Sequence, residues 1–447
     1  MSLRSEVLVF RFKLTVSSIA FLLTSFGAQA SENLCEGFVT HNNDVMIPQV
    51  RKPPYMKYYR EPAFGTKVIR ITNSQPDEVR KPAYSTVQAW NADESLLLMW
   101  TQTKSYTTHQ LLDGHTYKVV RDLDFTPSDL EDVFWSHSDP DVLYYVSKIK
   151  PDAGEFKRYN VSTNISTTIK DFSPWCGTST PTPGGGVQMQ SLDDDLFGFR
   201  CLPSKGNRIM LTYRLSTDTV ITAPIGEGTR WDEWHAPIAT PSGKSLWYQG
   251  TSLAHDLKTI NHTLDMYKFH EHQNLGQTHD GQDAMFTLGF NKSPKGCDGD
   301  REDGVGHLIE HNMETGKCRN VVSMADGYPY TTSATHISAQ AYKKPGWIAM
   351  SSVGKGFEWL KNGKKAPALS SEIYLVNTDP DNKVVCRLAH HRSYAKLAKN
   401  GDYSAYFGEP HVTISPSGTR LFFGSDWYDS GSVDSYIIEL PGYKRPK

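Results

Sequence analysis

The chain repeats one pattern, in which a turn rich in Asp, Asn, Ser, Gly and Pro is followed at once by a short apolar strand. The two clearest copies are residues 347–351, which follow His336, and residues 421–427, which follow His411. Small units that each bury one face against the next are typical of repeat proteins. If the units pack around one axis, the residues just before each inner strand meet at a common mouth, and several histidines converge there.

Seven copies of the pattern can be counted, and most start about 40 to 70 residues apart, as four-stranded blades require. The predicted inner strands are residues 96–100, 142–146, 196–199, 245–248, 284–290, 347–351 and 420–424. Later strands of the same blades are visible at 155–161 and 372–377. We therefore predict an all-β protein with the fold of a seven-bladed β-propeller. Six or eight blades, or a β-sandwich, are the alternatives.

The domain organisation follows from where the strand pattern begins and ends. We expect an N-terminal segment over residues 31–66 and a single propeller domain over residues 67–447. Strand-like runs at 67–71 and 436–440 lie at the two ends of that domain. They predict a closing blade built from both ends of the chain.

Residues 1–30 have the features of a secretory signal peptide. Arg4, Arg11 and Lys13 form a basic start, an apolar run follows, and Ala28 and Ala30 provide the small-x-small pattern of a cleavage site. The apolar run is too short for the roughly 20 residues that span a bilayer, and no later stretch is long enough. We expect an exported protein, secreted or periplasmic, without a membrane span.

The charge of the chain argues against nucleic acid as a partner. The formal net charge is −2. Removal of residues 1–30, which carry +2, leaves about −4. Phosphate backbones need a basic surface. An anionic sugar can still bind through a local group of Arg, Lys, His or metal, and we expect the protein to act as a monomer.

The chain has six cysteines, all after residue 30. An even number in an exported chain favours disulfides over metal thiolates. Spacing suggests Cys176 with Cys201 and Cys297 with Cys318, which leaves Cys35 with Cys386 as a closure between the two ends. Six cysteines allow 15 connectivities, so spacing alone does not decide among them.

Four histidines precede the predicted inner strands of blades four to seven, namely His235, His279, His336 and His411. Side chains at these positions would ring the axial mouth. A single histidine of this kind is more often a hydrogen-bonded staple between blades. Four in consecutive blades favour a shared polar pocket. Neutral imidazoles with a carboxylate such as Glu409 suit zinc, manganese or iron.

The stretch from Pro410 to Trp427, which contains His411, resembles the last inner strand of TolB-like seven-bladed propellers, especially the oligogalacturonate lyases. Those enzymes and the propeller-type ulvan lyases cleave uronate polysaccharides by β-elimination. The resemblance covers residues 67–440. It implies a propeller and, less specifically, a polysaccharide lyase.

The resemblance also implies a metal site. Oligogalacturonate lyases hold a divalent metal with one earlier histidine and a Gln-x-x-His-x-His cluster. His336 corresponds to the earlier histidine and His411 to the last one, whereas Tyr406 and Glu409 occupy the other two positions. Glutamate binds manganese or calcium and tyrosine is a poor ligand, so the site is altered, uses another metal such as zinc, or is lost.

β-Elimination on a uronate needs a cation, a base for the C5 proton and an acid for the leaving oxygen. Arg230 or Arg214 could assist a metal as the cation. His279 or His235 could be the base, because histidine titrates near neutrality. Tyr248 is a candidate acid of the kind that ulvan lyases use, although a tyrosine on a strand is more often packed in the core.

Several other side chains leave alternatives open. Trp234 is one of five tryptophans near the predicted inner strands and could stack on a sugar ring. The pair His270 and His272 is expected on a solvated loop. A non-catalytic propeller that binds a glycan or a protein is the main alternative function. A glycoside hydrolase would need two carboxylates that flank the sugar bond. The candidates are Asp232, Glu233, Asp280 and Asp283, but no two of them form a recognisable pair in the sequence.

Overall fold

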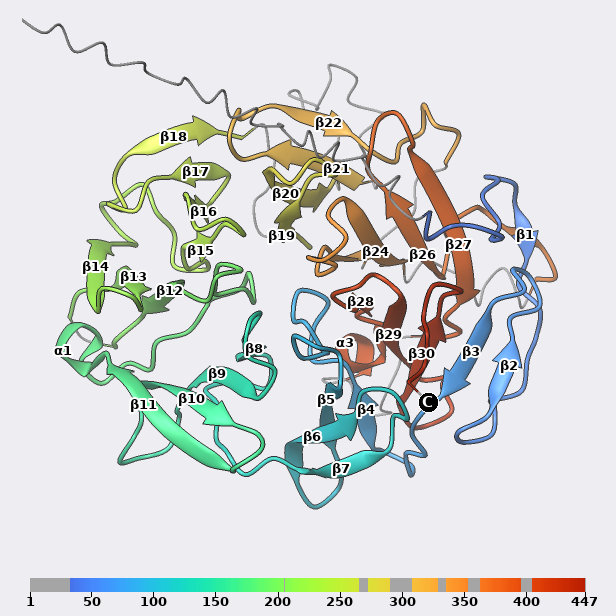
Figure 1. Cartoon of the computed structure of the whole chain (residues 1–447), viewed down its shortest axis with the longest axis horizontal. Coiled ribbons are helices and arrows are strands. Elements are labelled where there is room, and N and C mark those ends of the chain that lie inside the picture. Colours follow the sequence, from blue (N-terminus) through green and yellow to red (C-terminus); the bar gives the residue numbers. More distant parts are fainter. Residues whose placement is uncertain are drawn as a thin grey trace, which may run out of the picture. The chain divides into compact units, whose positions relative to one another are not determined.

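Seven small antiparallel sheets surround one central axis. The computed structural model describes residues 33–204, 206–264, 272–289, 308–328, 335–352, 362–394 and 404–446. Within these ranges, residues 34–446 form a seven-bladed β-propeller (Figure 1). The predicted fold class and blade number are confirmed.

The blades follow one another along the chain, and the first strand of a blade lies nearest the axis (Figure 1). Blades one and two contain β4 (Val79–Lys81), β5 (Leu96–Gln102), β6 (Thr107–Asp113), β7 (Val119–Asp122), β8 (Val133–Trp135), β9 (Val142–Val146), β10 (Glu155–Asn160) and β11 (Ile165–Asp171). Blades three and four contain β12 (Leu196–Cys201), β13 (Ile209–Arg214), β14 (Thr219–Pro224), β15 (Ile238–Ala239), β16 (Leu246–Tyr248), β17 (Thr251–Leu253) and β18 (Ile260–Thr263). Blades five and six contain β19 (Asn274–Gln277), β20 (Asp283–Leu288), β21 (Leu308–Asn312), β22 (Cys318–Asn320), β23 (Thr335–Ser338), β24 (Trp347–Ser352), β26 (Glu372–Asn377) and β27 (Val384–His390).

The seventh blade is built from both ends of the chain, as predicted. It contains β28 (Thr413–Ile414), β29 (Arg420–Ser425) and β30 (Asp434–Glu439), followed by β3 (Lys67–Arg70) and β2 (Tyr58–Arg60). β3 pairs antiparallel with β30, with Val68 opposite Ile438. β2 lies before residue 67, so the sheet draws on the segment that precedes the predicted start of the propeller domain.

Among the described residues, three short elements lie outside the blades. They are the helices α1 (Ser173–Cys176) and α3 (Ser404–Gly408) and a ribbon of β1 (Val45–Met46) with β25 (Lys365–Ala366). In the part of the chain that the structure describes, no helix has both the length and the apolar character that a bilayer crossing requires.

Six of the seven strands predicted as innermost are in fact the second strands of their blades, and the exception is β12, the first of the three strands of blade three. Residues 347–351 and 420–424 fall in β24 and β29, and each pairs with a shorter strand closer to the axis, β23 and β28 respectively. The second strands are buried along their whole length, which produces the apolar runs visible in the sequence. The innermost strands of the other six blades are only two to four residues long and carry no such run.

Two of the three predicted disulfides are present. Cys35 pairs with Cys386, which joins the N-terminal segment to blade six, and Cys176 pairs with Cys201 between blades two and three. The third predicted pair cannot be assessed, because Cys297 lies outside the described residues. Disulfides persist in oxidising compartments, which is compatible with the predicted export.

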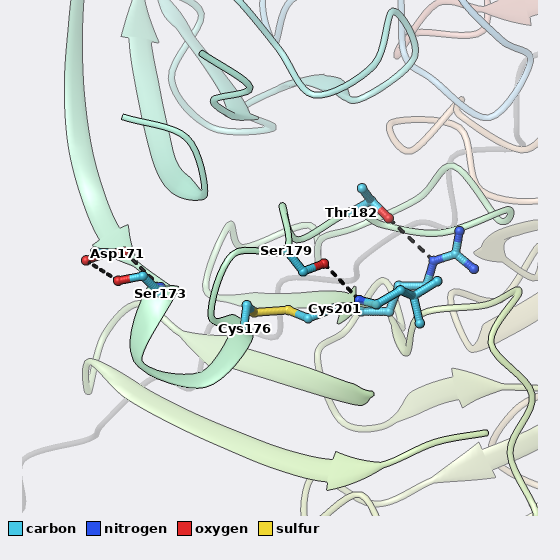
Figure 2. Close-up of a disulfide and its surroundings, with 8 residues drawn as sticks. Asp171, Ser173, Cys176, Ser179, Thr182 and Cys201 are labelled. Atoms are coloured by element: carbon cyan, nitrogen blue, oxygen red, sulfur yellow. Dashed lines mark hydrogen bonds between the residues drawn. A yellow bond between two sulfur atoms is a disulfide. The ribbon is translucent and has the colours of Figure 1, made fainter. Parts of the chain in front are cut away.

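The Cys176–Cys201 disulfide anchors the segment that crosses from blade two to blade three (Figure 2). Next to it, the backbone N–H of Leu202 donates to the Ser179 hydroxyl at 2.9 Å. The segment continues to Thr182, whose backbone N–H and carbonyl both bond to Arg200 on β12. The disulfide therefore fixes a stretch of chain that borders the pocket described below.

Removal of this disulfide is expected to lower stability without opening the ring. The cysteines are 25 residues apart, and closing a loop of that size in the unfolded chain contributes about 3 kcal/mol. The double variant Cys176→Ala/Cys201→Ala should lose about that much unfolding free energy in guanidinium titrations, with the Cys35–Cys386 bond intact. An unchanged midpoint would show that the segment is held by its hydrogen bonds alone.

A network of buried charges ties the N-terminal segment to blade six. Arg387 forms a two-point ion pair with Glu372, at 2.5 and 2.8 Å, and Arg392 forms another with Glu61, at 2.6 and 3.0 Å. His390 lies between the two pairs, with Nδ1 3.3 Å from Glu61. All five side chains are fully buried. His390 and Arg392 are therefore part of the interior.

Candidate functional site

Three of the predicted residues come together at one end of the innermost strands. His336 lies in β23, and Glu409 and His411 lie in the turn between α3 and β28. Glu409 Oε2 is 3.5 Å from His336 Nε2 and 3.3 Å from His411 Nε2. One ligand atom from each residue falls within 4.8 Å of the others. Two imidazole nitrogens and a carboxylate oxygen form a donor set that suits zinc or manganese.

Burial of this cluster favours the metal-binding form of His411. Both histidines are buried, whereas the Glu409 side chain keeps 16% of its surface exposed. Burial lowers the pKa of His411 well below its usual value, and the nearby Lys81 lowers it further. The imidazole of His411 is therefore neutral, which is the form that coordinates metals. The cluster fits a divalent cation in geometry and in charge.

A buried lysine stands behind the cluster. Lys81 Nζ is 2.9 Å from His411 Nδ1 and donates to the Glu409 carbonyl at 2.7 Å. Burial lowers the pKa of Lys81 to about 7, and burial raises the pKa of Glu409 to about 7. If His411 coordinates through Nε2, Nδ1 carries the proton and Lys81 must accept it as a neutral amine. Lys81, the group that would hold the Nδ1 proton of His411, therefore titrates close to neutrality.

His272 is a third histidine at the cluster, and it was predicted on a solvated loop and not at the site. Its ring centroid is 4.5 Å from that of His336. His272 lies two residues before β19, the same offset that separates His411 from β28. That shared offset was the available signal, but it becomes visible only once the short innermost strands are located. His270, the other member of the predicted surface pair, lies outside the described residues.

A pocket of about 410 Å³ opens beside the cluster, and we call it the side pocket. It is bordered by Tyr84, Tyr406 and His272, which also contact the cluster. The Tyr406 and Tyr84 rings lie 4.7 and 4.8 Å from the ring of His411. The charged side chains of the wall are Asp129, Glu131, Asp132 and Arg200.

Trp234 lines the side pocket as a candidate sugar platform. Its side chain is 56% exposed, the largest value among the exposed tryptophans of the described residues. The backbone of Gly185 lies against the indole, and an added Cβ there would come within 2.1 Å of the ring nitrogen. Glycine at this position therefore allows the close approach that supports the indole. The role of Trp234 in substrate binding stays a prediction.

The predicted base His235 and the predicted acid Tyr248 are both fully buried. His235 packs against Trp247, and its Nδ1 is 3.4 Å from Asp232. Tyr248 points into the apolar core between blades three and four and donates to the backbone carbonyl of Asp232 at 3.0 Å. Neither side chain lines the side pocket. This arrangement matches the structural alternatives: His235 is a staple between blades, and Tyr248 is an aromatic packed in the core.

The three other predicted residues lie away from the cluster. His279 follows β19 in the turn to β20, at the opposite end of the strand from His272, with Nε2 3.8 Å from Asp379. Arg214 pairs with Asp195 at 2.6 Å. Arg230 is exposed and lies over Trp231, 4.3 Å from its ring centre. His279 was misplaced because it precedes a second strand and not an innermost one.

Arg200 takes the place that was predicted for Arg230 or Arg214. It lies on β12, lines the side pocket and donates to the backbone carbonyl of Glu233. Its Nε is 3.4 Å from the hydroxyl of Thr182. No sequence signal separates Arg200 from other strand arginines. Its position depends on the crossing segment that the Cys176–Cys201 disulfide holds.

With this geometry in place, the chain can be compared with known proteins. No family model and no curated protein matches the sequence. Among solved structures, an oligogalacturonate lyase in complex with manganese matches with a TM-score of 0.57 and 17% identity, over 86% of this chain and 96% of that one. The chain shares the oligogalacturonate lyase fold.

A second oligogalacturonate lyase, from Vibrio parahaemolyticus, gives the same result. Its TM-score is 0.58 at 15% identity, and the match covers 87% of this chain and 97% of that one. TolB from Acinetobacter baumannii matches more loosely, with a TM-score of 0.35. The likeness to the two oligogalacturonate lyases establishes the propeller and its blade arrangement, and the resemblance drawn from residues 410–427 is confirmed at the level of the fold.

Proposed function

We propose that the protein is an exported polysaccharide lyase that cleaves uronate-containing chains by β-elimination with the help of a divalent metal. The observation that carries the proposal is the buried group of His336, Glu409 and His411 beside an open pocket. The same fold occurs in an oligogalacturonate lyase that was solved with manganese. A metal ion held by this group would neutralise the substrate carboxylate and stabilise the charge that develops on it.

The residues around the cluster provide the proton transfers. The reaction removes the C5 proton of the uronate, breaks the C4–O bond and leaves a C4–C5 double bond. His272 borders both the cluster and the side pocket, and we assign it as the base for the C5 proton. Arg200 and Trp234 would orient the sugar. His235, Tyr248, His279, Arg214 and Arg230 are not retained in these roles.

Tyr406 is the best placed acid for the leaving oxygen. Its side chain is 39% exposed and lines the side pocket, and its hydroxyl donates to Glu131. The partial desolvation of the phenol hydroxyl, with the charge of Glu131, raises the pKa of Tyr406 well above its usual value. The phenol therefore keeps its proton until the leaving oxygen needs it.

The test is to incubate the purified protein with polygalacturonate, ulvan and alternating uronate polymers and to follow the ultraviolet absorbance of the unsaturated product. We expect absorbance to rise on at least one polymer, to stop with a chelator and to return with added manganese. A rise that survives chelation would remove the metal from the proposal. No rise on any polymer, with the protein folded and metal bound, would overturn it.

A non-catalytic glycan-binding propeller is the second candidate. It is favoured by Tyr406, which stands where the resemblance to oligogalacturonate lyases places a ligand, so the donor set is smaller than in those enzymes. The exposed indole of Trp234 would serve binding equally well. Saturable binding of a uronate oligosaccharide with no absorbance change would favour this candidate.

Metal affinity is expected to rise with pH across neutrality. Deprotonation of Glu409 creates an anionic ligand, and loss of the Lys81 proton removes a neighbouring positive charge; both pKa values are about 7. Two protons then compete with the metal, so the association constant should rise about ten- to hundredfold from one pH unit below 7 to one unit above. Calorimetric titration with Mn²⁺ measures this. The variant Lys81→Met should show a shallower rise, and a flat profile in the native protein would contradict the assignment.

A further inference from the structure

The wall of the side pocket carries more negative than positive charge. Asp129, Glu131 and Asp132 line it from one loop of blade two, whereas Arg200 is the guanidinium on the wall among the described residues. Asp132 is 7% exposed, and its carboxylate accepts a hydrogen bond from the Ser128 hydroxyl at 2.7 Å. No lysine or arginine within ion-pair distance compensates these three carboxylates in the described part of the chain.

The guanidinium of Arg200 already interacts with two other groups of the protein. Its guanidinium donates to the carbonyl of Glu233 and lies 3.4 Å from the hydroxyl of Thr182. Burial also lowers the pKa of Arg200. One partly engaged guanidinium can pair with a single carboxylate of a ligand, but it does not offset three carboxylates and a second anionic sugar.

The same pocket holds an amide that has no partner in the described part of the structure. Gln273 is 5% exposed, and neither its side-chain oxygen nor its side-chain nitrogen forms a hydrogen bond. A buried amide without partners is costly, so this group is suited to a ligand that both donates and accepts. Hydroxyl and acetamido groups of a sugar do so, whereas a carboxylate only accepts. The exposed indole of Trp234 offers a face for the apolar side of the sugar ring.

We propose that the side pocket binds a sugar without a carboxylate, so that the substrate alternates a uronate with a neutral or amino sugar. This inference rests on the proposed lyase function. A metal ion held by His336, Glu409 and His411 would accept one carboxylate, and His272 and Tyr406 join that cluster directly to the side pocket. In a homopolymer of uronate, the next sugar would bring its own carboxylate towards Asp129 and Asp132. Like charges in a partly buried pocket repel strongly.

The first test compares substrates at about one pH unit above the pKa values of Glu131 and Asp132, both of which burial raises to about 7, so that the wall is ionised. Unsulfated chondroitin and hyaluronan alternate glucuronate with an N-acetylhexosamine, whereas every sugar of polygalacturonate carries a carboxylate. We expect kcat/KM for at least one alternating polymer to exceed that for polygalacturonate by tenfold or more. Equal or faster cleavage of polygalacturonate would overturn the inference and leave the lyase function standing.

The second test removes two of the wall carboxylates that are expected to repel a second uronate. The double variant Asp129→Asn/Asp132→Asn should raise the ratio of polygalacturonate to alternating-polymer kcat/KM at least tenfold. Asp77→Asn/Asp381→Asn, an equal change of charge at two exposed positions away from the pocket, should leave that ratio unchanged. A ratio that moves equally in both variants, or in neither, would contradict the inference.

A binding measurement separates this inference from the proposed reaction. Titration of tryptophan fluorescence with oligosaccharides of the two kinds reads occupancy near Trp234 without turnover. If no polymer is cleaved, the lyase function fails, and tighter binding of the alternating oligosaccharide would still support the pocket assignment. Tighter binding of oligogalacturonate would overturn it.

Discussion

Replacement of His336 by alanine is expected to lower kcat/KM on the preferred polymer at least ~10³-fold, equivalent to about 4 kcal/mol of transition-state stabilisation. His336 contributes one of two imidazole nitrogens to the cluster, and its ring is buried against those of His411 and His272. Loss of the ring removes a ligand and leaves a gap that water can enter. Steady-state rates and Mn²⁺ calorimetry on the same preparation measure both effects.

The matched control is His41→Ala, which removes an exposed imidazole far along the chain from the cluster. It should retain activity and metal binding. If His336→Ala binds Mn²⁺ as tightly as the native protein but is inactive, then His336 acts on the substrate and not as a ligand. If both properties survive, the cluster is a structural staple and the metal-assisted mechanism is wrong.

Replacement of Arg387 by methionine is expected to cost about 3 to 5 kcal/mol of unfolding free energy. Arg387 and Glu372 are both fully buried, and loss of the arginine leaves an unpaired carboxylate in the core of blade six. Arg387 also donates to the backbone carbonyl of Asn43 at 2.7 Å, so the N-terminal segment loses an anchor. Guanidinium unfolding monitored by circular dichroism measures the loss.

A surface pair provides the comparison for this prediction. Lys104 and Asp77 are 3.3 Å apart, but both side chains are about 70% exposed. Lys104→Met should change the unfolding free energy by less than about 1 kcal/mol, because water screens an exposed pair. Equal losses in the two variants would mean that burial does not set the strength of the Arg387 pair.

The fold was predictable because the strongest strands are the second and third of each blade. Residues 347–352 and 420–425 are buried on both faces, so their apolar runs stand out without any alignment. The innermost strands could not be found in this way. Ile238–Ala239 and Thr413–Ile414 are two residues long, too short to show a period.

The site residues that could be predicted are those that lie at or just before an innermost strand. His336, Glu409 and His411 were identified through their resemblance to a motif, and the structure places them together. His279 was assigned by its distance from a second strand and lies at the wrong end of blade five, while His272 occupies the equivalent position.

The side-pocket residues were beyond a sequence argument. Arg200 and Gln273 face the pocket because segments from blades three and five approach each other there, and contacts of this kind leave no local pattern. Lys81 reaches His411 across 330 positions of sequence. Charged residues that are distant in sequence and buried together become visible only in three dimensions.

The two-ended construction of blade seven sets the order in which the ring can form. Synthesis proceeds from the N terminus, so β3 is made at the start and waits for β30, its partner, until the last residues emerge. Until then, one edge of β3 keeps unpaired backbone groups that invite contacts with other chains. Ring closure is therefore a late event that depends on very distant pairing, which is slow. A chain that stops short of residue 434 would lack the partner strand and remain an open arc, with the first and last blades both exposed to aggregation.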